Sequence, residues 1–433
     1  MKTLLLLYMG DETVTASAGT ERVLTNMANA MAEKGYDVIV ATNDKTDAAP
    51  YFPFDSRVHC LYLDVDTKKI PFSVKVKREV NRIFPILDKP VEAYRASVSV
   101  RKLRDQLKGD SIDCIIAYNH EAIQVADRLV HGTVPIIAMM HNAIRIIMGN
   151  CNGRALAEKA KANVIQVLMP SYVAETRQYL PHTPVVWIPN VVEPVCPEKQ
   201  AHPGVVKDRY RIITVGRIDG LQKQTHILVE AFASLAKQYP QWDVWIWGEV
   251  KKKDYYQRLC QFIEAQGLTG RIHLAGTTTA VQDELRQADI FAFPSAFEGF
   301  GLALTEAMAM GLPSVGFRSA DAVNELIVDG KNGILCEDGV PAFAQGLERL
   351  MKEPALRSAM GRQAVSDMEP YYPEAVWNQW QRLIDEQNSA GFAALRGIYG
   401  VYTFFSVRSA RYQVMDFLSD FMCRFPGYFH CSP

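Results

Sequence analysis

The sequence predicts an α/β protein with two domains, each built around a parallel sheet. Three observations lead to this prediction: short apolar strands alternate with amphipathic helices, the alternation restarts near residue 211, and a proline-rich stretch separates the halves. Strands that alternate with helices usually form parallel sheets covered on both faces. A chain of 433 residues is also too long for one hydrophobic core.

The first half contains five short apolar runs that we expect to be strands, and three segments with helical periodicity. The expected strands are 4–8, 37–41, 114–118, 135–139 and 164–168. The expected helices are 23–34, 93–107 and 121–130. We assign residues 1–190 to the first domain. We take residues 191–205 as the linker, because this region is rich in proline and lacks periodicity.

The second half repeats the alternation over residues 206–370, which we take as the second domain. The expected strands are 211–215, 243–247, 271–274, 290–293 and 314–316. The expected helices are 227–238, 255–266 and 281–287. The last helix that we expect spans 375–385, within a segment 371–387. The tail 388–433 is rich in aromatic residues, which fits either an extra helical layer or a helix that contacts a membrane or a partner.

Composition indicates a cytoplasmic protein. Hydrophobic content is 48%, charged content is 22% and the net charge is −1, so nothing global favours nucleic acid as a partner. The eight cysteines are scattered, which is typical of a reducing compartment and predicts no metal site. The apolar opening is too short for a signal peptide. No apolar run reaches the ~18 residues of a membrane span.

Charge is uneven over residues 68–108, where twelve Lys and Arg residues face four acids. Apolar residues are interleaved with these cations at Val74, Val76, Val80, Ile83 and Phe84, as in a basic amphipathic helix. Such a stretch could rest on an anionic membrane, attract an anionic substrate, or form a solvated helix face.

The segment 294–313 carries the strongest chemical signal. Glu298 and Glu306 bracket a glycine-rich turn that runs into a short apolar helix, which Gly311 and Pro313 should end. Gly299 and Gly301 allow the backbone to approach a ligand closely. Because a helix start presents unpaired N–H groups, this turn would suit a phosphate.

Cations and polar residues at other expected strand ends add to this signal. Arg217 follows Gly216 at the end of a strand, and Lys223 comes shortly after, so both could neutralise a diphosphate. In the first half, Gly19 and Thr20 open a helix that Thr20 could cap. No Gly-x-Gly-x-x-Gly follows that strand, which weakens a dehydrogenase interpretation.

Two histidines end successive strands of the first half. His120 and His141 could each hydrogen-bond a sugar hydroxyl in a cleft at the carboxyl ends of the strands. Either could instead be a loop histidine whose hydrogen bonds are satisfied within the protein.

Taken together, these residues resemble the GT-B retaining glycosyltransferases of family 4 (group 1), over residues 1–387. The markers are Gly19-Thr20-Glu21-Arg22, His141-Asn142, Ile188-Pro189-Asn190-Val191, Val215-Gly216-Arg217 with Lys223, Phe293-Pro294-Ser295 through Glu298 and Glu306, and Asp329-Gly330-Lys331-Asn332-Gly333. The chain differs at Ala18, where the family often has a second glycine, and at Gln224, where glycine usually follows the lysine.

The resemblance implies two Rossmann-like domains with parallel sheets facing across an interdomain cleft. A nucleotide-diphosphate sugar would bind the second domain and an acceptor the first, and residues 371–387 would return toward the first domain. No cofactor or metal is implied beyond this UDP or GDP sugar. The implied catalytic residues are His141, Arg217, Lys223 and Glu298. The implied donor-binding residues are Gly19, Thr20, Gly216, Gly299, Phe300, Gly301, Leu302 and Glu306, and candidate acceptor or sugar contacts are His120 and Asn142.

The expected activity is hexosyl transfer, with retention and without a metal, to a glycan or lipid-linked acceptor. By analogy the pathway would be a bacterial surface polysaccharide such as lipopolysaccharide or capsule, with the enzyme in the cytoplasm or on the inner face of the plasma membrane. Two alternatives stay open: a sugar-nucleotide-binding subunit without activity, and a GT-B epimerase or inverting transferase.

Overall fold

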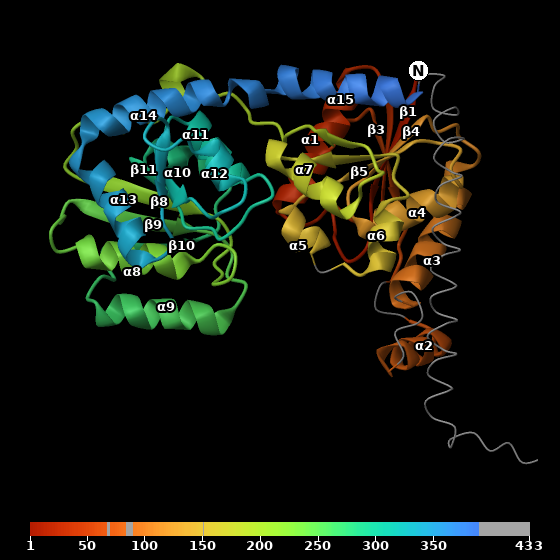
Figure 1. Ribbon diagram of the computed structural model, residues 1–433, viewed down its shortest axis with the longest axis horizontal. Helices are drawn as coiled ribbons and strands as arrows, with labels where there is room; N and C mark the ends of the chain where they lie inside the picture. Colours follow the sequence, from red (N-terminus) through yellow and green to blue (C-terminus); the bar gives the residue numbers. More distant parts are fainter. Residues whose placement is uncertain (67–69, 84–89, 150, 389–433) are drawn as a thin grey trace, which may run out of the picture. The chain divides into compact units, whose positions relative to one another are not determined.

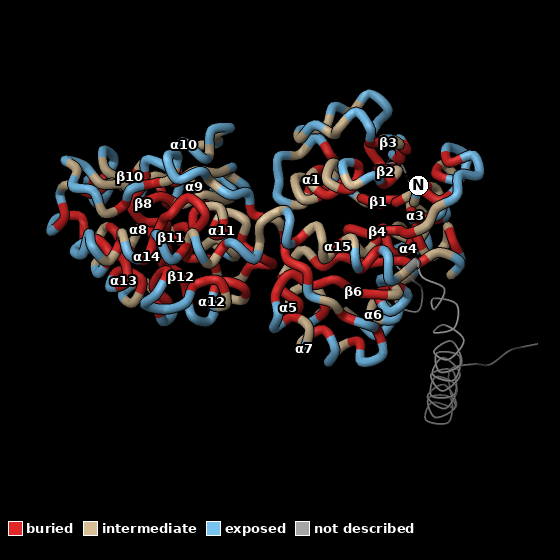
Figure 2. The backbone as a smooth tube through the Cα atoms, turned by 90° about the horizontal axis from the view of Figure 1, so that it is seen from above, coloured by how far each residue is buried: buried red, intermediate tan, exposed pale blue. Residues whose placement is uncertain are grey.

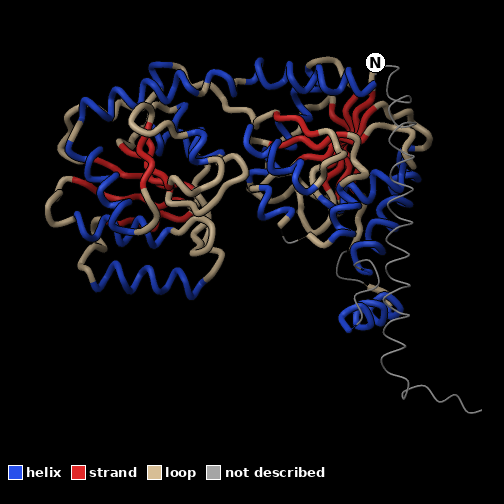
Figure 3. The backbone as a smooth tube through the Cα atoms, in the orientation of Figure 1, coloured by secondary structure: helices blue, strands red, loops and turns tan. Residues whose placement is uncertain are grey.

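The structure is a computed structural model that describes residues 1–66, 70–83, 90–149 and 151–388. Contacts divide the chain into two compact units, Met1–Gln381 and Arg382–Pro433. The first unit contains two sheets of parallel strands with helices packed around them (Figures 1 and 3). The tail that we expect to contact a membrane or a partner lies, from residue 389, outside the described residues.

The first sheet has the strand order β3-β2-β1-β4-β5-β6-β7. Its strands are β1 Thr3–Tyr8, β2 Asp37–Thr42, β3 Val58–Tyr62, β4 Cys114–Ala117, β5 Ile136–Met139, β6 Val164–Val167 and β7 Val185–Trp187. Its helices are α1 Gly19–Glu33, α2 Phe72–Ile83, α3 Pro90–Leu107, α4 His120–Val130, α5 Ile144–Met148, α6 Gly153–Lys159 and α7 Pro170–Tyr179. Helices cover both faces, so the central strands are continuous apolar runs that lie buried in Figure 2.

The second sheet has the order β10-β9-β8-β11-β12-β13. Its strands are β8 Tyr210–Val215, β9 Trp242–Trp247, β10 Ile272–Gly276, β11 Ile290–Phe293, β12 Ser314–Phe317 and β13 Gly333–Cys336. Its helices are α8 Thr225–Leu235, α9 Lys253–Ala265, α10 Val281–Arg286, α11 Leu302–Ala309, α12 Val323–Leu326, α13 Val340–Lys352 and α14 Pro354–Asp367. Helix α15 Pro373–Asn388 contacts the first domain instead, where Lys34 Nζ at the end of α1 donates to Asn378 Oδ1 at 2.9 Å (Figure 1). Short 3-10 turns occupy Pro197–Lys199 and Glu369–Tyr371.

The expected strands and helices are all present, and the sheets are parallel as predicted. Strands β3, β7 and β13 were not predicted from the sequence, nor were helices α5, α6, α7, α12, α13 and α14. β3 is a half-exposed edge strand and β7 has three residues, so neither produces a long apolar run. β13 follows the Asp329-Gly330-Lys331-Asn332-Gly333 turn and also has only four residues. Helix bounds differ from the prediction by a few residues, as is usual at helix ends.

The prediction that Thr20 caps the first helix is wrong. Helix α1 begins at Gly19, so Thr20 lies in its first turn and Ala18 holds the N-cap position. Ala18 has an extended backbone (φ −93°, ψ 174°). Because this conformation is open to any residue, the chain does not need the second glycine that the family often has there.

Gln224 stands where the family usually has glycine, and it takes the conformation that glycine favours. Its backbone is left-handed (φ 45°, ψ 43°) at the N-cap of α8. Glutamine in place of glycine therefore leaves the path of the loop unchanged. It does place a residue with a side chain in the left-handed backbone region, at a cost of about 1–2 kcal/mol.

We expect Gln224→Gly to raise the free energy of unfolding by about 0.5–1 kcal/mol, because relief of this strain exceeds the extra flexibility of glycine in the unfolded chain. Denaturant unfolding would measure the change. The matched control is Ala233→Gly inside α8, which should lose about 1 kcal/mol. Destabilisation by both substitutions would contradict the prediction.

Within the described residues, no helix is both long and apolar enough to cross a lipid bilayer. The basic stretch 68–108 forms α2 and α3, except that residues 67–69 and 84–89 lie outside the described residues.

Candidate active site

The glycine-rich turn after β11 is shaped as the sequence predicts. Gly301 has a left-handed backbone (φ 81°) and occupies the N-cap position of α11, whose first carbonyl bond runs from the Thr305 amide to Gly301 at 3.0 Å. The helix then ends at Ala309, just before Gly311 and Pro313. The free amides of the first turn are therefore available to an anion at this turn.

Gly299 has a different role, because it touches the end of a strand in the first domain. A Cβ atom at this position would lie 2.3 Å from the carbonyl oxygen of His141 and 2.8 Å from Cα of Asn142. Contacts below 3.0 Å essentially never occur for a real Cβ. The turn and the His141-Asn142 backbone can meet only because residue 299 has no side chain.

Glu298 and Lys223 form the central ion pair of the site. Lys223 Nζ donates to Glu298 Oε1 at 2.6 Å, and it also lies 4.8 Å from the centre of the Phe293 ring. Glu298 is only 6% exposed. The pair thus places one cation and one buried carboxylate beside the start of α11.

Arg217 joins the same cluster through a residue that the sequence analysis did not identify. Arg217 Nη2 donates to Gln222 Oε1 at 2.8 Å, and Gln222 Nε2 donates to the Phe297 carbonyl at 3.3 Å and reaches Glu298 Oε2 at 3.5 Å. The structure therefore brings Arg217, Lys223 and Glu298 together around Gln222. A glutamine in a loop belongs to no distinguishing pattern, so no signal in the sequence could have found it.

Asp219 holds this loop in place. Its Oδ1 accepts the amides of Leu221, Gln222 and Lys223 at 3.1, 2.8 and 3.0 Å. Gly216 lies beside the aliphatic part of Lys223, since a Cβ there would be 3.2 Å from Lys223 Cε. An aspartate three or four residues before a loop lysine is a recognisable turn signal, and it could have been found from the sequence.

His141 lies at the end of β5 with an unused nitrogen. Its ring stacks on Tyr118 at a centroid distance of 5.3 Å, and its buried Nε2 has no hydrogen-bond partner in the described part of the chain. Burial lowers the pKa of His141 to about 4. The neutral ring therefore offers one polar atom to a ligand, because buried polar atoms in proteins are normally satisfied.

This pKa predicts a pH dependence of stability. A histidine with a folded pKa near 4 and an unfolded value near 6.5 contributes stability above pH 6.5 that is lost as pH falls toward 4. The loss should be about 2–3 kcal/mol. Comparing wild type with His141→Gln by denaturant unfolding at neutral and acidic pH isolates this group, since other titrations cancel. Parallel pH curves for the two proteins would contradict the prediction.

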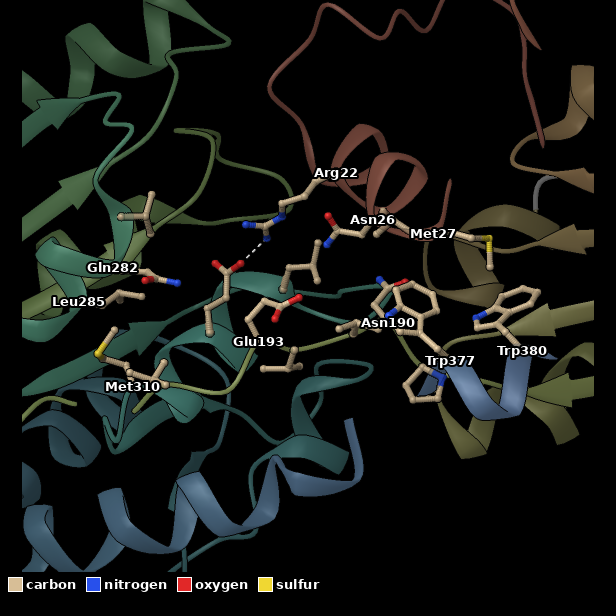
Figure 4. Close-up of a pocket in the computed structure, with 18 of the residues that line it drawn as sticks. Arg22, Asn26, Met27, Asn190, Glu193, Gln282, Leu285, Met310, Trp377 and Trp380 are labelled. Carbon is tan, nitrogen blue, oxygen red and sulfur yellow. Dashed lines mark ion pairs between the residues drawn. The ribbon is translucent and has the colours of Figure 1, made fainter. Parts of the chain in front are cut away.

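Gly19 and Glu306 each contact a residue of the other domain. A Cβ at Gly19 would lie 3.1 Å from Leu302 Cδ1, so the start of α1 contacts the start of α11. Glu306 forms an ion pair with Arg22 of α1 (Figure 4). Burial raises the pKa of Glu306, and Arg22 opposes that rise.

Arg22, Leu302 and Glu306 line a pocket of about 120 Å³ that also includes Asn190, Glu193 and Trp377 (Figure 4). Pockets for small ligands usually measure about 300–1,000 Å³. A nucleotide sugar would therefore require side chains such as Arg22 to move. The sequence analysis did not predict that Arg22 pairs with Glu306, because a partner from another domain leaves no local pattern.

Three other predicted site residues have partners of their own. His120 Nε2 lies 2.8 Å from Glu158 Oε2, which lowers the pKa of Glu158. Asn142 Oδ1 accepts the Ala143 amide at 2.9 Å. Phe300 is buried against Tyr371, so only its backbone could serve a ligand.

One Asp-x-Asp sequence, a pattern that can hold a metal ion bound to phosphate, bears on the prediction that no metal is used. It is Asp64-Val65-Asp66, just after the edge strand β3 of the first domain. Lys102 Nζ donates to the Asp64 carbonyl at 2.7 Å there. Among the described residues, no group of three or more His, Cys, Asp or Glu side chains is arranged to hold a metal ion.

Tyr172 of α7 supports the glycine-rich turn from the first domain. Its hydroxyl donates to the Glu298 carbonyl at 2.6 Å, and the bond is buried. Neither α7 nor Tyr172 was predicted from the sequence. The bond fixes the backbone that carries Glu298 at the point where Gly299 meets His141.

We expect Tyr172→Phe to lower the free energy of unfolding by about 1–2 kcal/mol, because it leaves a buried carbonyl without its donor. Turnover should fall about 10-fold as the Glu298 backbone loosens. Tyr179→Phe, in the same helix, is the matched control. Unchanged turnover in a folded Tyr172→Phe protein would show that the bond does not position the turn.

Comparison with known proteins relates the second domain to a known family. Residues 197–367, which contain Arg217, Lys223, Glu298 and Glu306, match the family model described as glycosyl transferases group 1. This segment belongs to the group 1 glycosyl transferases. The chain is also 24% identical over 375 residues to an uncharacterized glycosyltransferase of Haemophilus influenzae, covering 86% of this chain and 97% of the relative.

Solved structures confirm the GT-B fold with two Rossmann-like domains. A sucrose-phosphate synthase from Thermosynechococcus elongatus aligns with a TM-score of 0.72 and 18% identity over 91% of this chain and 100% of its own. The TarM protein of S. aureus, solved as a point mutant with fondaparinux, α-GlcNAc-glycerol and UDP, gives a TM-score of 0.70 and 15% identity, covering 89% and 100% of the two chains. The family match thus covers residues 197–367, and the fold of the chain agrees with it.

Proposed function

We propose that this glycosyltransferase moves a hexose-type sugar from a UDP or GDP sugar to a glycan or lipid-linked acceptor with retention of configuration. The observation that carries the proposal is the Lys223–Glu298 pair beside the start of α11, met by the His141 strand end of the first domain. The TarM structure contains UDP, which supports a nucleotide donor for this chain. Assignment to family 4 stays a prediction.

In this proposal Arg217 and Lys223 bind the diphosphate, together with the amides of Phe300 and Gly301. Glu298 would bind sugar hydroxyls once Lys223 turns toward the phosphate, and Glu306 would bind the ribose in place of Arg22. The Nε2 atom of His141, which has no partner among the described residues, would accept a hydrogen bond from the donor sugar or donate one to it. Gly19, whose lack of a side chain lets α1 approach Leu302, would border the phosphates.

The reaction would proceed by breaking the bond between the anomeric carbon and the leaving phosphate oxygen, which keeps the electron pair. Stabilising that charge is the main task, and fixed cations and helix amides supply it without reorganisation. The acceptor oxygen would attack from the same face, and its proton would pass to the departing phosphate. In this proposal sugar hydroxyls and Gln222 Nε2 occupy the oxygens of Glu298, which favours this route over a covalent glycosyl–enzyme intermediate.

We also propose transfer without a metal or an additional cofactor. Arg217 and Lys223 provide two positive charges at the proposed diphosphate site, which is the role that a divalent cation would otherwise fill. The Asp64-Val65-Asp66 sequence follows β3 in the other domain. Full activity in excess chelator is the expected result. Activity that depends on added magnesium would contradict the proposal that transfer needs no metal ion.

A panel of UDP and GDP sugars tests the proposed function. A donor that binds only the folded protein must raise the melting temperature, and the best donor should then be hydrolysed slowly by the full chain. NMR of the transfer product should show the anomeric configuration of the donor. Stabilisation without hydrolysis or transfer would favour a binding subunit, a 2-epimer product would favour an epimerase, and an inverted product would favour an inverting transferase.

A cytoplasmic location and a role in a bacterial surface polysaccharide pathway, such as lipopolysaccharide or capsule, remain predictions. The basic stretch 68–108 favours an anionic acceptor, since exposed cations concentrate anionic ligands near a surface.

A further inference from the structure

Helix α2 exposes a stripe of large apolar side chains. Phe72 is 81% exposed, Val76 is 45% exposed and Val80 is 47% exposed, and they follow one another at intervals of four residues. Side chains at this spacing lie on one face of a helix. Scattered apolar residues are normal on a surface, but a continuous helical stripe indicates a binding surface.

The opposite face of α2 attaches it to the protein. Val74 is 9% exposed and is the only residue of the helix that is buried among those whose side chains are described. At 3.6 residues per turn, Val74 points roughly 160° away from the centre of the stripe. The helix contacts α3 (Figure 1), so the stripe faces away from the side that Val74 buries.

Cations flank the stripe on both sides. Lys75 and Arg82 lie on one side of the stripe and Lys77 lies on the other, each about 100–120° from its centre. Arg78 lies about 160° from that centre, on the opposite side of the helix, and all four side chains are exposed. Glu79 is the single acid of the helix, and it pairs with Arg78 at 2.8 Å and with Arg82 at 3.9 Å. Lys75 and Lys77 form no ion pair with another residue of the described part.

We propose that α2 docks on the surface of an anionic lipid bilayer, with Phe72, Val76 and Val80 inserted among the acyl chains. Lys75 and Lys77 would bind the headgroups. A helix that lies in the interface requires an apolar face bordered by Lys and Arg, and its binding combines buried apolar area with attraction to anionic lipid. A protein partner would not require cations on both edges of the stripe, and a nucleic acid would not require the stripe.

The proposal goes beyond sugar transfer and does not depend on it. It gives the first domain, where we place the acceptor, a way to reach lipid-linked molecules. The membrane contact predicted for the stretch 68–108 is thus assigned to α2. In this helix Val76 and Val80 face outward, whereas Val74 faces inward.

Vesicle flotation with the full chain tests the proposal. Vesicles of phosphatidylcholine with about 30% phosphatidylglycerol should carry the wild-type protein, and vesicles of phosphatidylcholine alone should carry far less. The triple variant Phe72→Ser, Val76→Ser, Val80→Ser should bind anionic vesicles at least ~10-fold more weakly. Lys75→Gln with Lys77→Gln should weaken binding and reduce its sensitivity to salt.

Matched controls use exposed residues of the second domain. Val206 is 82% exposed, so Val206→Ser changes an equally exposed apolar side chain, and Lys237→Gln with Lys252→Gln removes two exposed cations. Both controls should bind like wild type. The melting temperature of every variant should match wild type, because the substituted α2 residues are exposed.

A second measurement separates insertion from surface attraction. The variant Phe72→Trp should show fluorescence quenching by brominated acyl chains beyond that of wild type. Absence of that extra quenching, equal flotation of the triple variant, or no flotation of wild type would each overturn the proposal. A concentration-dependent dimer that the triple variant loses, without any vesicle binding, would also overturn it, because the stripe would then join two copies of this chain.

Discussion

Arg217→Ala should lower kcat about 10²–10³-fold while leaving the free energy of unfolding unchanged. Arg217 is exposed and its side chain donates a hydrogen bond to Gln222, so its loss leaves no buried group unpaired. In the transition state, however, it would be one of two cations facing the leaving diphosphate. Removing one such preorganised charge-assisted contact costs about 2.7–4 kcal/mol.

Steady-state kinetics with the donor found by the thermal panel would measure this effect. Lys252→Ala removes an exposed cation of the same domain and is the matched control. Lys223→Ala should be at least as inactive, but it also leaves the buried Glu298 without its cation, which can destabilise the fold. Lys223→Ala combined with Glu298→Gln removes that second effect. Wild-type turnover in folded Arg217→Ala would refute the assigned role.

Gly299→Ala should lower turnover by about 100-fold, although it adds only a methyl group. The new Cβ would lie 2.3 Å from the His141 carbonyl and would force the turn away from the first domain. A displacement near 1 Å in a catalytic constellation costs about 10²-fold in rate. The backbone φ of Gly299 is compatible with alanine, so the effect would come from the contact and not from torsional strain.

Gly270→Ala is the matched control for this substitution. Gly270 also lacks a positive φ, and nothing lies within 4 Å of an added Cβ. That variant should keep wild-type turnover. Equal activity of Gly299→Ala and Gly270→Ala would mean that close approach between residue 299 and the His141 strand end is not needed for transfer.

The local sequence pattern was sufficient to predict the fold class, although not every strand and helix. Apolar runs such as Leu4–Tyr8 and Ile290–Phe293 are buried on both faces, so each carries its own signal regardless of its neighbours. The same pattern could not find β3, whose residues are half exposed at the sheet edge. It also missed the inward direction of Val74, which depends on α3 packing against α2.

The parts of the candidate site that lie within one continuous segment could be predicted from the sequence. The turn at Gly301, the helix after it and the positions of Glu298 and Glu306 all follow from one stretch of sequence. Contacts between domains were not predictable, because Tyr172 and Glu298 are 126 residues apart. The pairing of Arg22 with Glu306 is of the same kind, and it places a first-domain cation where the ribose would bind.

A crystal structure of the chain with its nucleoside diphosphate tests the central claim most directly. The account predicts phosphate oxygens within hydrogen-bond distance of Arg217 and Lys223 and of the Phe300 and Gly301 amides, with Lys223 turned away from Glu298. Phosphates bound elsewhere, with the Lys223–Glu298 pair intact, would contradict it.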